Sequence, residues 1–156
     1  MRALSRSRSD FVDPQRGPIL SVRSIVALVL VVLGITWVAY YYVAVRADPN
    51  AFPAADPGDP AFMADLGDWN YAIGFGLFMV GLFVAAHPST PLGRNRGVVV
   101  TMLTCFLVGL VWICTYYVLT GQNLDEVPVF NDLGQYNLLV GIAFMAVGFA
   151  YATRWE

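Results

Sequence analysis

Four long apolar runs, separated by polar segments, dominate the chain. The uncharged runs cover residues 24–45, 69–86, 97–119 and 136–153. A helix needs about 20 apolar residues, within a range of about 17–25, to cross the hydrocarbon core of a bilayer. Spanning strands would instead alternate apolar and polar positions, and the runs do not alternate. The pattern therefore predicts an all-α integral membrane protein with four transmembrane helices.

The composition also favours a membrane over water. Of the 156 residues, 58% are hydrophobic and 13% are charged, whereas typical globular proteins have about 25% charged residues. A soluble body of this size exposes a large share of its surface and cannot hide so much apolar area. We therefore expect the lipid bilayer to surround the helices.

The arginines predict the orientation. Among the nine basic residues, all of them arginine, Arg46 alone lies between the first and second runs. The others precede the first run, lie between the second and third, or follow the fourth: Arg2, Arg6, Arg8, Arg16, Arg23, Arg94, Arg96 and Arg154. An arginine excess in short loops marks the cytoplasmic side. We expect both termini in the cytoplasm and the loops 46–68 and 120–135 outside.

The chain contains an internal repeat. The stretch "DLGDWNYAIGFGLFMVGLF" at 65–83 matches "DLGQYNLLVGIAFMAVGFA" at 132–150 with an offset of 67, and "GITWVAYYYV" at 34–43 resembles "GLVWICTYYV" at 109–118 with an offset of 75. Each copy crosses twice, so the copies have the same orientation, unlike the inverted repeats of many transporters. We predict two tandem parallel helical hairpins. Their bounds are 22–87 and 97–156, with a cytoplasmic linker at 88–96 and a basic, disordered cytoplasmic tail at 1–21.

Glycine recurs at the same places in both copies. The second helix of each hairpin has three glycines seven residues apart, and each first helix has one: Gly67, Gly74, Gly81, Gly134, Gly141, Gly148, Gly34 and Gly109. Small residues along one stripe let another backbone approach closely, and a seven-residue spacing suits a left-handed crossing. The stripes either close each hairpin or the bundle, or dock a helix of a partner protein.

Aromatic residues gather near the expected outer ends of the first and third helices. Trp37 with Tyr41, and Trp112 with Tyr116, are four residues apart and share a helix face. Tryptophan and tyrosine favour the headgroup level of a bilayer. We interpret these residues as an interfacial belt, with a docking surface for a partner's membrane segment as the alternative.

The sequence lacks the patterns typical of catalysis, metal binding and coupled transport. His87 is the single histidine, and no Ser-His-Asp set, Cys-x-x-Cys pair or phosphate-binding glycine loop is present. No charged residue lies within the four runs, whereas proton relays and coupled transporters carry ionisable groups there. Asp68 and Asn70 are expected to cap free backbone N–H groups at the start of the second helix. We predict no catalytic site, metal, cofactor, small-molecule substrate or nucleic-acid partner.

The second helix of each hairpin starts with a motif that follows an aromatic-rich first helix. It reads LG-x-WN-Y-A-I and is carried in the first copy by Leu66, Gly67, Trp69, Asn70, Tyr71, Ala72 and Ile73, and in the second by Leu133, Gly134, Tyr136 and Asn137. This motif resembles the signature of CrgA, a family of small actinobacterial cell-division membrane proteins. The tail "TRWE", with Arg154 and Trp155, resembles the family's C-terminus. Asp68 stands where the family has proline, and the first copy ends in "AAH". Members resemble one hairpin, so this chain resembles a tandem duplication that fuses what a single hairpin would do as a dimer.

The resemblance implies a non-enzymatic scaffold of the divisome in the cell membrane, enriched at the division septum. Its implied partners are septal membrane proteins such as peptidoglycan transpeptidases, and FtsZ, whose ring assembly it would influence together with septal wall synthesis. The stretch "RALSRSRSDF" is either a topology signal or a segment that binds cytoplasmic partners and anionic lipid. An accessory subunit of a respiratory or transport complex is the alternative function, and a transporter is a third.

Overall fold

The computed structural model describes residues 20–47, 52–53, 56–93, 96–121, 124, 127 and 129–153. The expected tail lies outside the described residues except for positions 20 and 21, and so do Arg154 and Trp155. No strand occurs within the described ranges, so the all-helical class is confirmed. The elements are α1 (Val22–Tyr40), the π-helix η1 (Tyr41–Val45), α2 (Ala61–Leu66), α3 (Trp69–Ala85), α4 (Arg96–Thr120), α5 (Phe130–Leu133) and α6 (Tyr136–Ala152).

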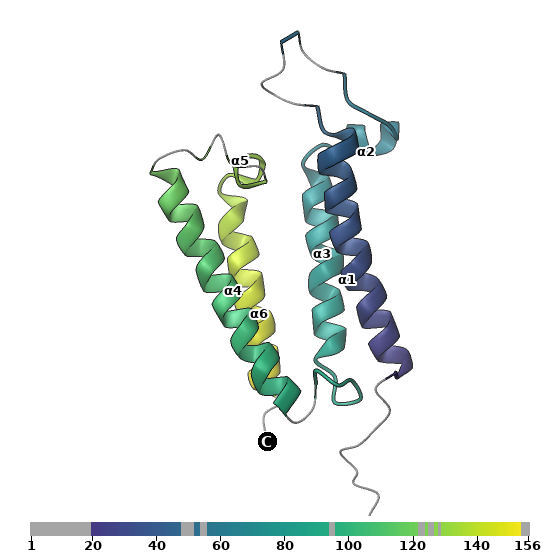
Figure 1. Ribbon diagram of the computed structural model, residues 1–156, viewed down its shortest axis with the longest axis vertical. Coiled ribbons are helices and arrows are strands. Elements are labelled where there is room, and N and C mark those ends of the chain that lie inside the picture. Colours follow the sequence, from purple (N-terminus) through teal and green to yellow (C-terminus); the bar gives the residue numbers. More distant parts are fainter. Residues whose placement is uncertain are drawn as a thin grey trace, which may run out of the picture.

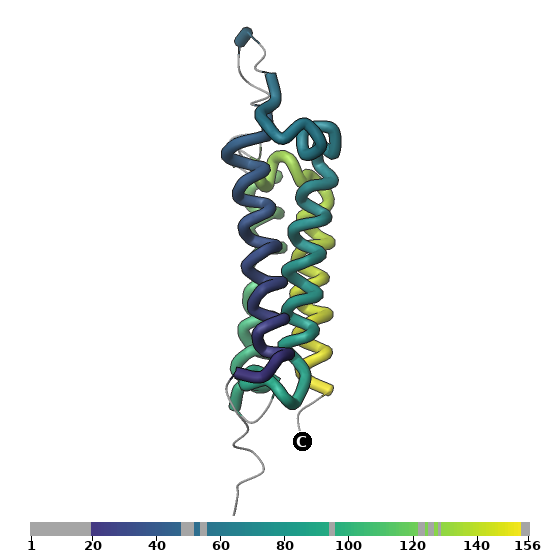
Figure 2. Tube along the Cα trace, turned by 90° about the vertical axis from the view of Figure 1, so that its right-hand side faces the viewer, coloured from purple at the N-terminus to yellow at the C-terminus, as the bar shows by residue number. Residues whose placement is uncertain are grey.

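The four long helices form two antiparallel hairpins (Figure 1). In hairpin 1, α1 packs against α3, and in hairpin 2, α4 packs against α6. The short helices α2 and α5 lie at one end of the bundle, called here the α2/α5 end, while α1 begins and α6 finishes at the opposite end. In the view of Figure 2, the axes of the four long helices are nearly aligned. The main helix contact between the two hairpins is that of α3 with α6.

Among the described residues, two helical segments are long and apolar enough to cross a membrane, namely Val22–Val45 and α4. Helices α3 and α6 have 17 residues each, at the short limit of about 17–25 for a spanning helix. Large apolar side chains project outward from the long helices, with Leu28 at 62% and Val111 at 61% exposure. A surface of this kind is unfavourable in water but is solvated by lipid. The four-span topology remains a prediction.

Glycines bring the two long helices of hairpin 1 into backbone contact. A Cβ atom at Gly34 would lie 2.5 Å from the carbonyl oxygen of Gly74 and 2.7 Å from the backbone nitrogen of Phe78. A Cβ atom at Gly81 would lie 2.9 Å from the backbone nitrogen of Val31. Because backbone atoms cannot move aside as a side chain can, α1 and α3 reach this separation only with glycine at these positions.

The same contact recurs in hairpin 2. A Cβ atom at Gly109 would lie 2.6 Å from the carbonyl oxygen of Gly141, and one at Gly148 would lie 3.3 Å from the ring of Phe106. In each copy, therefore, three glycines of the long helices face the other helix of their own hairpin: Gly34, Gly74 and Gly81 in hairpin 1, and Gly109, Gly141 and Gly148 in hairpin 2. This arrangement leaves them no free surface on which a helix of another protein could dock.

Gly67 and Gly134 differ from the expectation that they begin each packing stripe. They follow α2 and α5 with φ angles of 50° and 47°, a region that glycine enters far more readily than other residues. A Cβ atom at either position would have no heavy atom within 4 Å. Their role is to reverse the chain between a short helix and the long helix that follows, since no helix packs against them.

The interior has two layers, and residues of both hairpins contribute to each. The layer near the α2/α5 end comprises Tyr41, Val45, Met63, Tyr71, Leu133 and Val140. The layer nearer the opposite end comprises Met79, Ala86, Val98, Cys105, Val147 and Tyr151. Rings from the two hairpins also meet edge to face, with centroids 5.8 Å apart for Phe78 and Phe144. The hairpins therefore share one continuous interior.

We predict that Gly34→Leu lowers the stability of the protein, because a side chain there would collide with the backbone of α3. Overpacking of this kind costs about 1–3 kcal/mol or more. The measurement is thermal unfolding of the full chain in detergent, followed by circular dichroism.

Gly76→Ala is the matched control, since a Cβ atom at Gly76 would meet nothing within 4 Å. Replacing a helix-interior glycine by alanine should leave stability unchanged or raise it by about 0.5–1 kcal/mol. Equal losses in the two variants would contradict the assignment of the close contact to Gly34.

Candidate functional site

The motif at the start of α3 folds around the buried side chain of Asn70. Its Nδ2 atom donates to the carbonyl oxygens of Met63 and Gly67, both at 2.7 Å. Its Oδ1 atom accepts a hydrogen bond of 3.2 Å from the indole Nε1 of Trp37 on α1. Asn70 therefore joins the last turn of α2 to the first helix of the hairpin.

This arrangement corrects the expectation that Asp68 and Asn70 cap the free N–H groups of α3. The side chain of Asp68 makes no capping hydrogen bond. Asn70 instead satisfies carbonyl groups at the end of α2, because α2 finishes immediately before α3 begins and leaves these acceptors unpaired within the helix. The short helix α2 was not expected from the sequence.

The second copy repeats two of the three hydrogen bonds. The Nδ2 atom of Asn137 donates to the carbonyl oxygens of Phe130 and Gly134, both at 2.8 Å. The equivalent of the third bond would join Trp112 Nε1 to Asn137 Oδ1, and both atoms are buried without a partner in the described chain. The Trp112 ring instead stacks on Phe130 at a centroid distance of 4.6 Å. Both hairpins thus share the fold of the motif, whereas the hydrogen bond from the motif asparagine to the first long helix occurs in hairpin 1 alone among the described residues.

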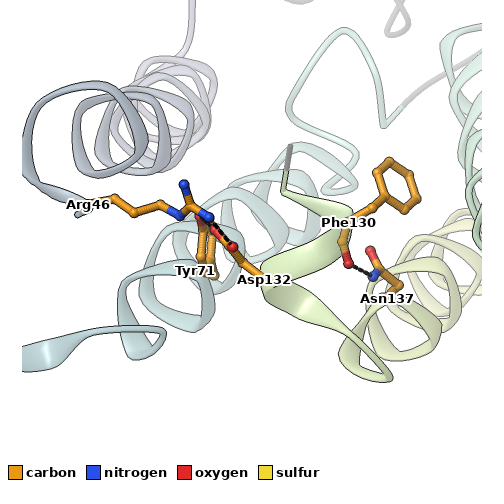
Figure 3. A network of polar contacts seen from close by, with 5 residues as sticks. All are labelled: Arg46, Tyr71, Phe130, Asp132 and Asn137. Atoms are coloured by element: carbon orange, nitrogen blue, oxygen red, sulfur yellow. Dashed lines mark hydrogen bonds and ion pairs between the residues drawn. The ribbon is translucent and has the colours of Figure 1, made fainter. Parts of the chain in front are cut away.

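A polar junction joins the two hairpins at the α2/α5 end (Figure 3). The Asp132 carboxylate on α5 forms an ion pair of 2.5 Å with the Arg46 guanidinium, which follows η1. Its other oxygen accepts a hydrogen bond of 2.5 Å from the hydroxyl of Tyr71 on α3. The side chains of Arg46 and Asp132 are 17% and 10% exposed. Both oxygens of the Asp132 carboxylate, in hairpin 2, are therefore bound by residues of hairpin 1. Arg46, Tyr71 and Asp132 are together called the outer junction.

Arg46 has a further contact besides its ion pair with Asp132. Its guanidinium carbon lies 5.1 Å from the centroid of the Tyr42 ring, at the distance of a cation–π contact. The hydrogen bond to Asp132 raises the pKa of Arg46 above its usual value. The charged arginine is thus stabilised at both its face and its edge.

The outer junction has no counterpart made from the equivalent residues of the repeat. The equivalent of Asp132 in hairpin 1 is Asp65, which is exposed and makes no ion pair or hydrogen bond with the described residues. Gly121 and Leu138 stand in hairpin 2 where hairpin 1 has Arg46 and Tyr71. The junction can therefore form in one direction only, from hairpin 1 to hairpin 2.

A groove of about 580 Å³ lies between α3 and α6. Its lining is mainly apolar and includes Ala72, Gly76, Leu139 and Ala143, with Asp68 and Asp132 near the α2/α5 end. The motif aromatics Trp69 and Tyr136 also line it, and they are 73% and 68% exposed. No group of three or more His, Cys, Asp or Glu residues that could hold a metal ion occurs in the described ranges.

A family model described as "Cell division protein CrgA" matches the chain twice, over residues 6–87 and 86–156. The chain belongs to the CrgA family. The two matches together cover nearly the whole chain and overlap only at residues 86–87, at the end of hairpin 1, so the tandem duplication is confirmed.

Curated relatives carry the same name. The Cell division protein CrgA of Streptomyces avermitilis is 38% identical over 65 residues, which are 42% of this chain and 71% of the relative. That of Corynebacterium aurimucosum is 37% identical over 59 residues, or 38% of this chain and 52% of the relative. That of Corynebacterium glutamicum is 70% identical over 23 residues, or 15% of this chain and 26% of the relative. No solved structure matches the chain.

The aromatic residues expected to form an interfacial belt point inward instead. Tyr41 and Tyr116 are buried, at 5% and 7% exposure. Trp37 and Trp112 are partly buried and pack against the layer near the α2/α5 end. Trp37 and Trp112 lie on the same helix face as Gly34 and Gly109, respectively, and that face is turned toward the other long helix of the same hairpin. The aromatic residues that do face outward at this end include Trp69, Tyr117 and Tyr136.

The outer junction was missed from the sequence, although one signal was present. Arg46 is the single arginine between the first and second runs, far from the others. A lone basic group beside acidic loops favours an ion pair, but the sequence contains several acidic candidates within reach. Only the packing of α5 against hairpin 1 selects Asp132.

We predict that Asp132→Asn destabilises the full chain by about 1–3 kcal/mol, because a charged hydrogen bond to partly buried Arg46 is lost. Asp65→Asn is the matched control, since it changes the equivalent residue of hairpin 1, which is exposed and has no ion pair with any described residue. Unfolding by SDS titration in mixed micelles measures both variants. Equal stabilities would show that the outer junction does not hold the hairpins together.

Proposed function

We propose that this CrgA-family chain is a non-enzymatic membrane scaffold of the division machinery, built from two fused hairpins that act as one unit. Family membership supports the role in cell division. The outer junction and the shared interior support a single unit, because they tie hairpin 1 to hairpin 2 at both ends of the bundle. The scaffold spans the membrane four times with both termini in the cytoplasm.

Four spans are supported by the pairing of the helices. Each 17-residue helix lies along a partner that is long and apolar enough to cross a membrane. A helix pair closed by glycine contacts over its length cannot place one member in lipid and the other in water. The arginine distribution supports cytoplasmic termini.

The exposure of Trp69 is the observation that supports partner binding at the motif. The fold uses the other polar or special residues of the motif, since Gly67 makes the turn, Asn70 ties α2 to α1 and Tyr71 binds Asp132. Trp69 is 73% exposed, so the fold itself does not require it. Tyr136, its equivalent, is 68% exposed across the same groove. Exposed tryptophan and tyrosine are frequent anchors of protein interfaces.

Septal membrane proteins, including peptidoglycan transpeptidases, are the partners proposed for this aromatic pair. Trp69 and Tyr136 lie at the α2/α5 end, which the arginine pattern places on the outer side of the membrane. That is the side on which wall synthesis occurs. An effect on FtsZ-ring assembly is proposed for the cytoplasmic side, where the basic tail would lie.

We predict that Trp69→Ala abolishes enrichment at mid-cell while leaving the protein in the membrane. Loss of an aromatic anchor weakens an interface by about 2 kcal/mol or more, and stability is unaffected because Trp69 is exposed. The measurement is imaging of a C-terminal green fluorescent protein fusion, expressed at native level in cells without the untagged protein. The fusion fluoresces only if the C-terminus is cytoplasmic, so it also tests the orientation.

Tyr117→Ala is the control for this experiment, since Tyr117 is 62% exposed near the same end but lies outside the motif. It should retain the mid-cell band. A uniform membrane signal for the unsubstituted chain throughout the cell cycle would contradict the proposal and favour an accessory subunit of another membrane complex. Equal behaviour of the two variants would remove Trp69 from the interface.

A further inference from the structure

The two hairpins share a sequence pattern but contact each other through different faces. Val147 is fully buried, whereas its equivalent Val80 is 52% exposed. Met79 is 9% exposed, whereas its equivalent Ala146 is exposed. Hairpin 1 thus uses one side of α3, and hairpin 2 uses another side of α6. A contact between like units through unlike faces is heterologous and does not close on itself by two-fold symmetry.

Each hairpin therefore exposes a face whose equivalent is buried in the other hairpin. The open face of α3 holds the equivalents of buried α6 residues, namely Ile73, Val80 and Val84. The open face of α6 holds the equivalents of α3 residues at the contact, namely Leu138, Ala146 and Phe149. All six are exposed or partly exposed. The internal contact shows what can cover these open faces. Inside one chain, the contact face of α3 covers the contact face of α6, and the open faces carry the equivalents of these same two sets of residues.

We propose that the open face of α3 in one chain docks against the open face of α6 in a second copy of the chain. The contact between chains repeats the internal contact between hairpins. In lipid, apolar character alone gives helices no reason to associate, and complementary packing is required. The internal contact supplies evidence of that complementarity. This inference does not depend on the partners proposed above.

The contact between chains lacks the polar part of the internal one. Asp65 of the next copy would occupy the position of Asp132, and it is exposed and unpaired within the part of the chain that the structure describes. Gly121 and Leu138 would face it in place of Arg46 and Tyr71. Association between chains is therefore weaker than association between hairpins, and it depends on the density of the protein in the membrane.

The first test measures energy transfer between donor-labelled and acceptor-labelled full-length chains in phosphatidylethanolamine–phosphatidylglycerol vesicles. The unsubstituted chain should show transfer above the random-mixing level, declining as lipid is added. Val80→Trp should weaken association about tenfold, since it adds bulk to the open face of α3. Leu110→Trp is the control, because Leu110 and its equivalent Ile35 are both 54% exposed and neither copy buries that face. Transfer at the random level, or equal effects of the two variants, would overturn the proposal.

The second test restores the missing polar residues. A chain with Gly121→Arg and Leu138→Tyr would present to Asp65 of the next copy the groups that bind Asp132 internally. A Cβ atom at Gly121 would meet nothing closer than 3.6 Å, so the fold has room for the change. This chain should associate about tenfold more tightly, as expected for hydrogen bonds to a charged group. Adding Asp65→Asn should remove the gain.

Gel filtration and helix content establish that each variant is folded before transfer is measured. If the doubly substituted chain is folded and associates no more tightly than the unsubstituted chain, Asp65 does not occupy the equivalent position and the proposal fails. If the gain survives Asp65→Asn, the added residues act elsewhere and the proposal also fails. The Val80→Trp comparison stands independently of this variant.

Discussion

Both carboxylate oxygens of Asp132 are bound by residues of the other hairpin, and the relation between the hairpins depends on this contact. Arg46 and Tyr71 approach α5 from two elements of hairpin 1. Since the carboxylate is only 10% exposed, it is costly to leave unpaired. Because α5 leads directly into α6, holding Asp132 also fixes the start of α6 beside α3. The groove and the spacing of Trp69 from Tyr136 follow from that placement.

Glycine sets the structure inside each hairpin, whereas unlike residues set the structure between them. The contact of Gly34 with Gly74 has its equivalent at Gly109 and Gly141, with nearly the same separation. By contrast, the outer junction, the Trp37–Asn70 hydrogen bond and the burial of Val147 each occur in one copy only. The two copies thus share the structure of the hairpin but differ in their contacts. As a result, one chain exposes two different faces, one on α3 and one on α6.

Much of this architecture follows from local sequence patterns. Uncharged run lengths predict the long helices within a few residues, and the repeat predicts their pairing into hairpins. Three features did not follow. The inward aromatic face depends on which side of α1 and α4 the glycines occupy, and a pair such as Trp37 and Tyr41 is equally suited to headgroups and to a packed interior. Gly67 shares the spacing of Gly74, yet its positive φ makes it a turn residue. The outer junction joins residues 86 positions apart, which no local pattern can specify.

The most direct test of the account is the distance between the hairpins with and without the Asp132 carboxylate. Spin labels at Phe62 on α2 and Val118 on α4, both exposed, would be measured by pulsed electron paramagnetic resonance in lipid nanodiscs, in a chain lacking Cys105 and Cys114. The account predicts one narrow distance distribution for this chain and for its Asp65→Asn variant, and a broad distribution after Asp132→Asn. A distribution that Asp132→Asn leaves unchanged would contradict the claim that this carboxylate holds the two hairpins in one arrangement.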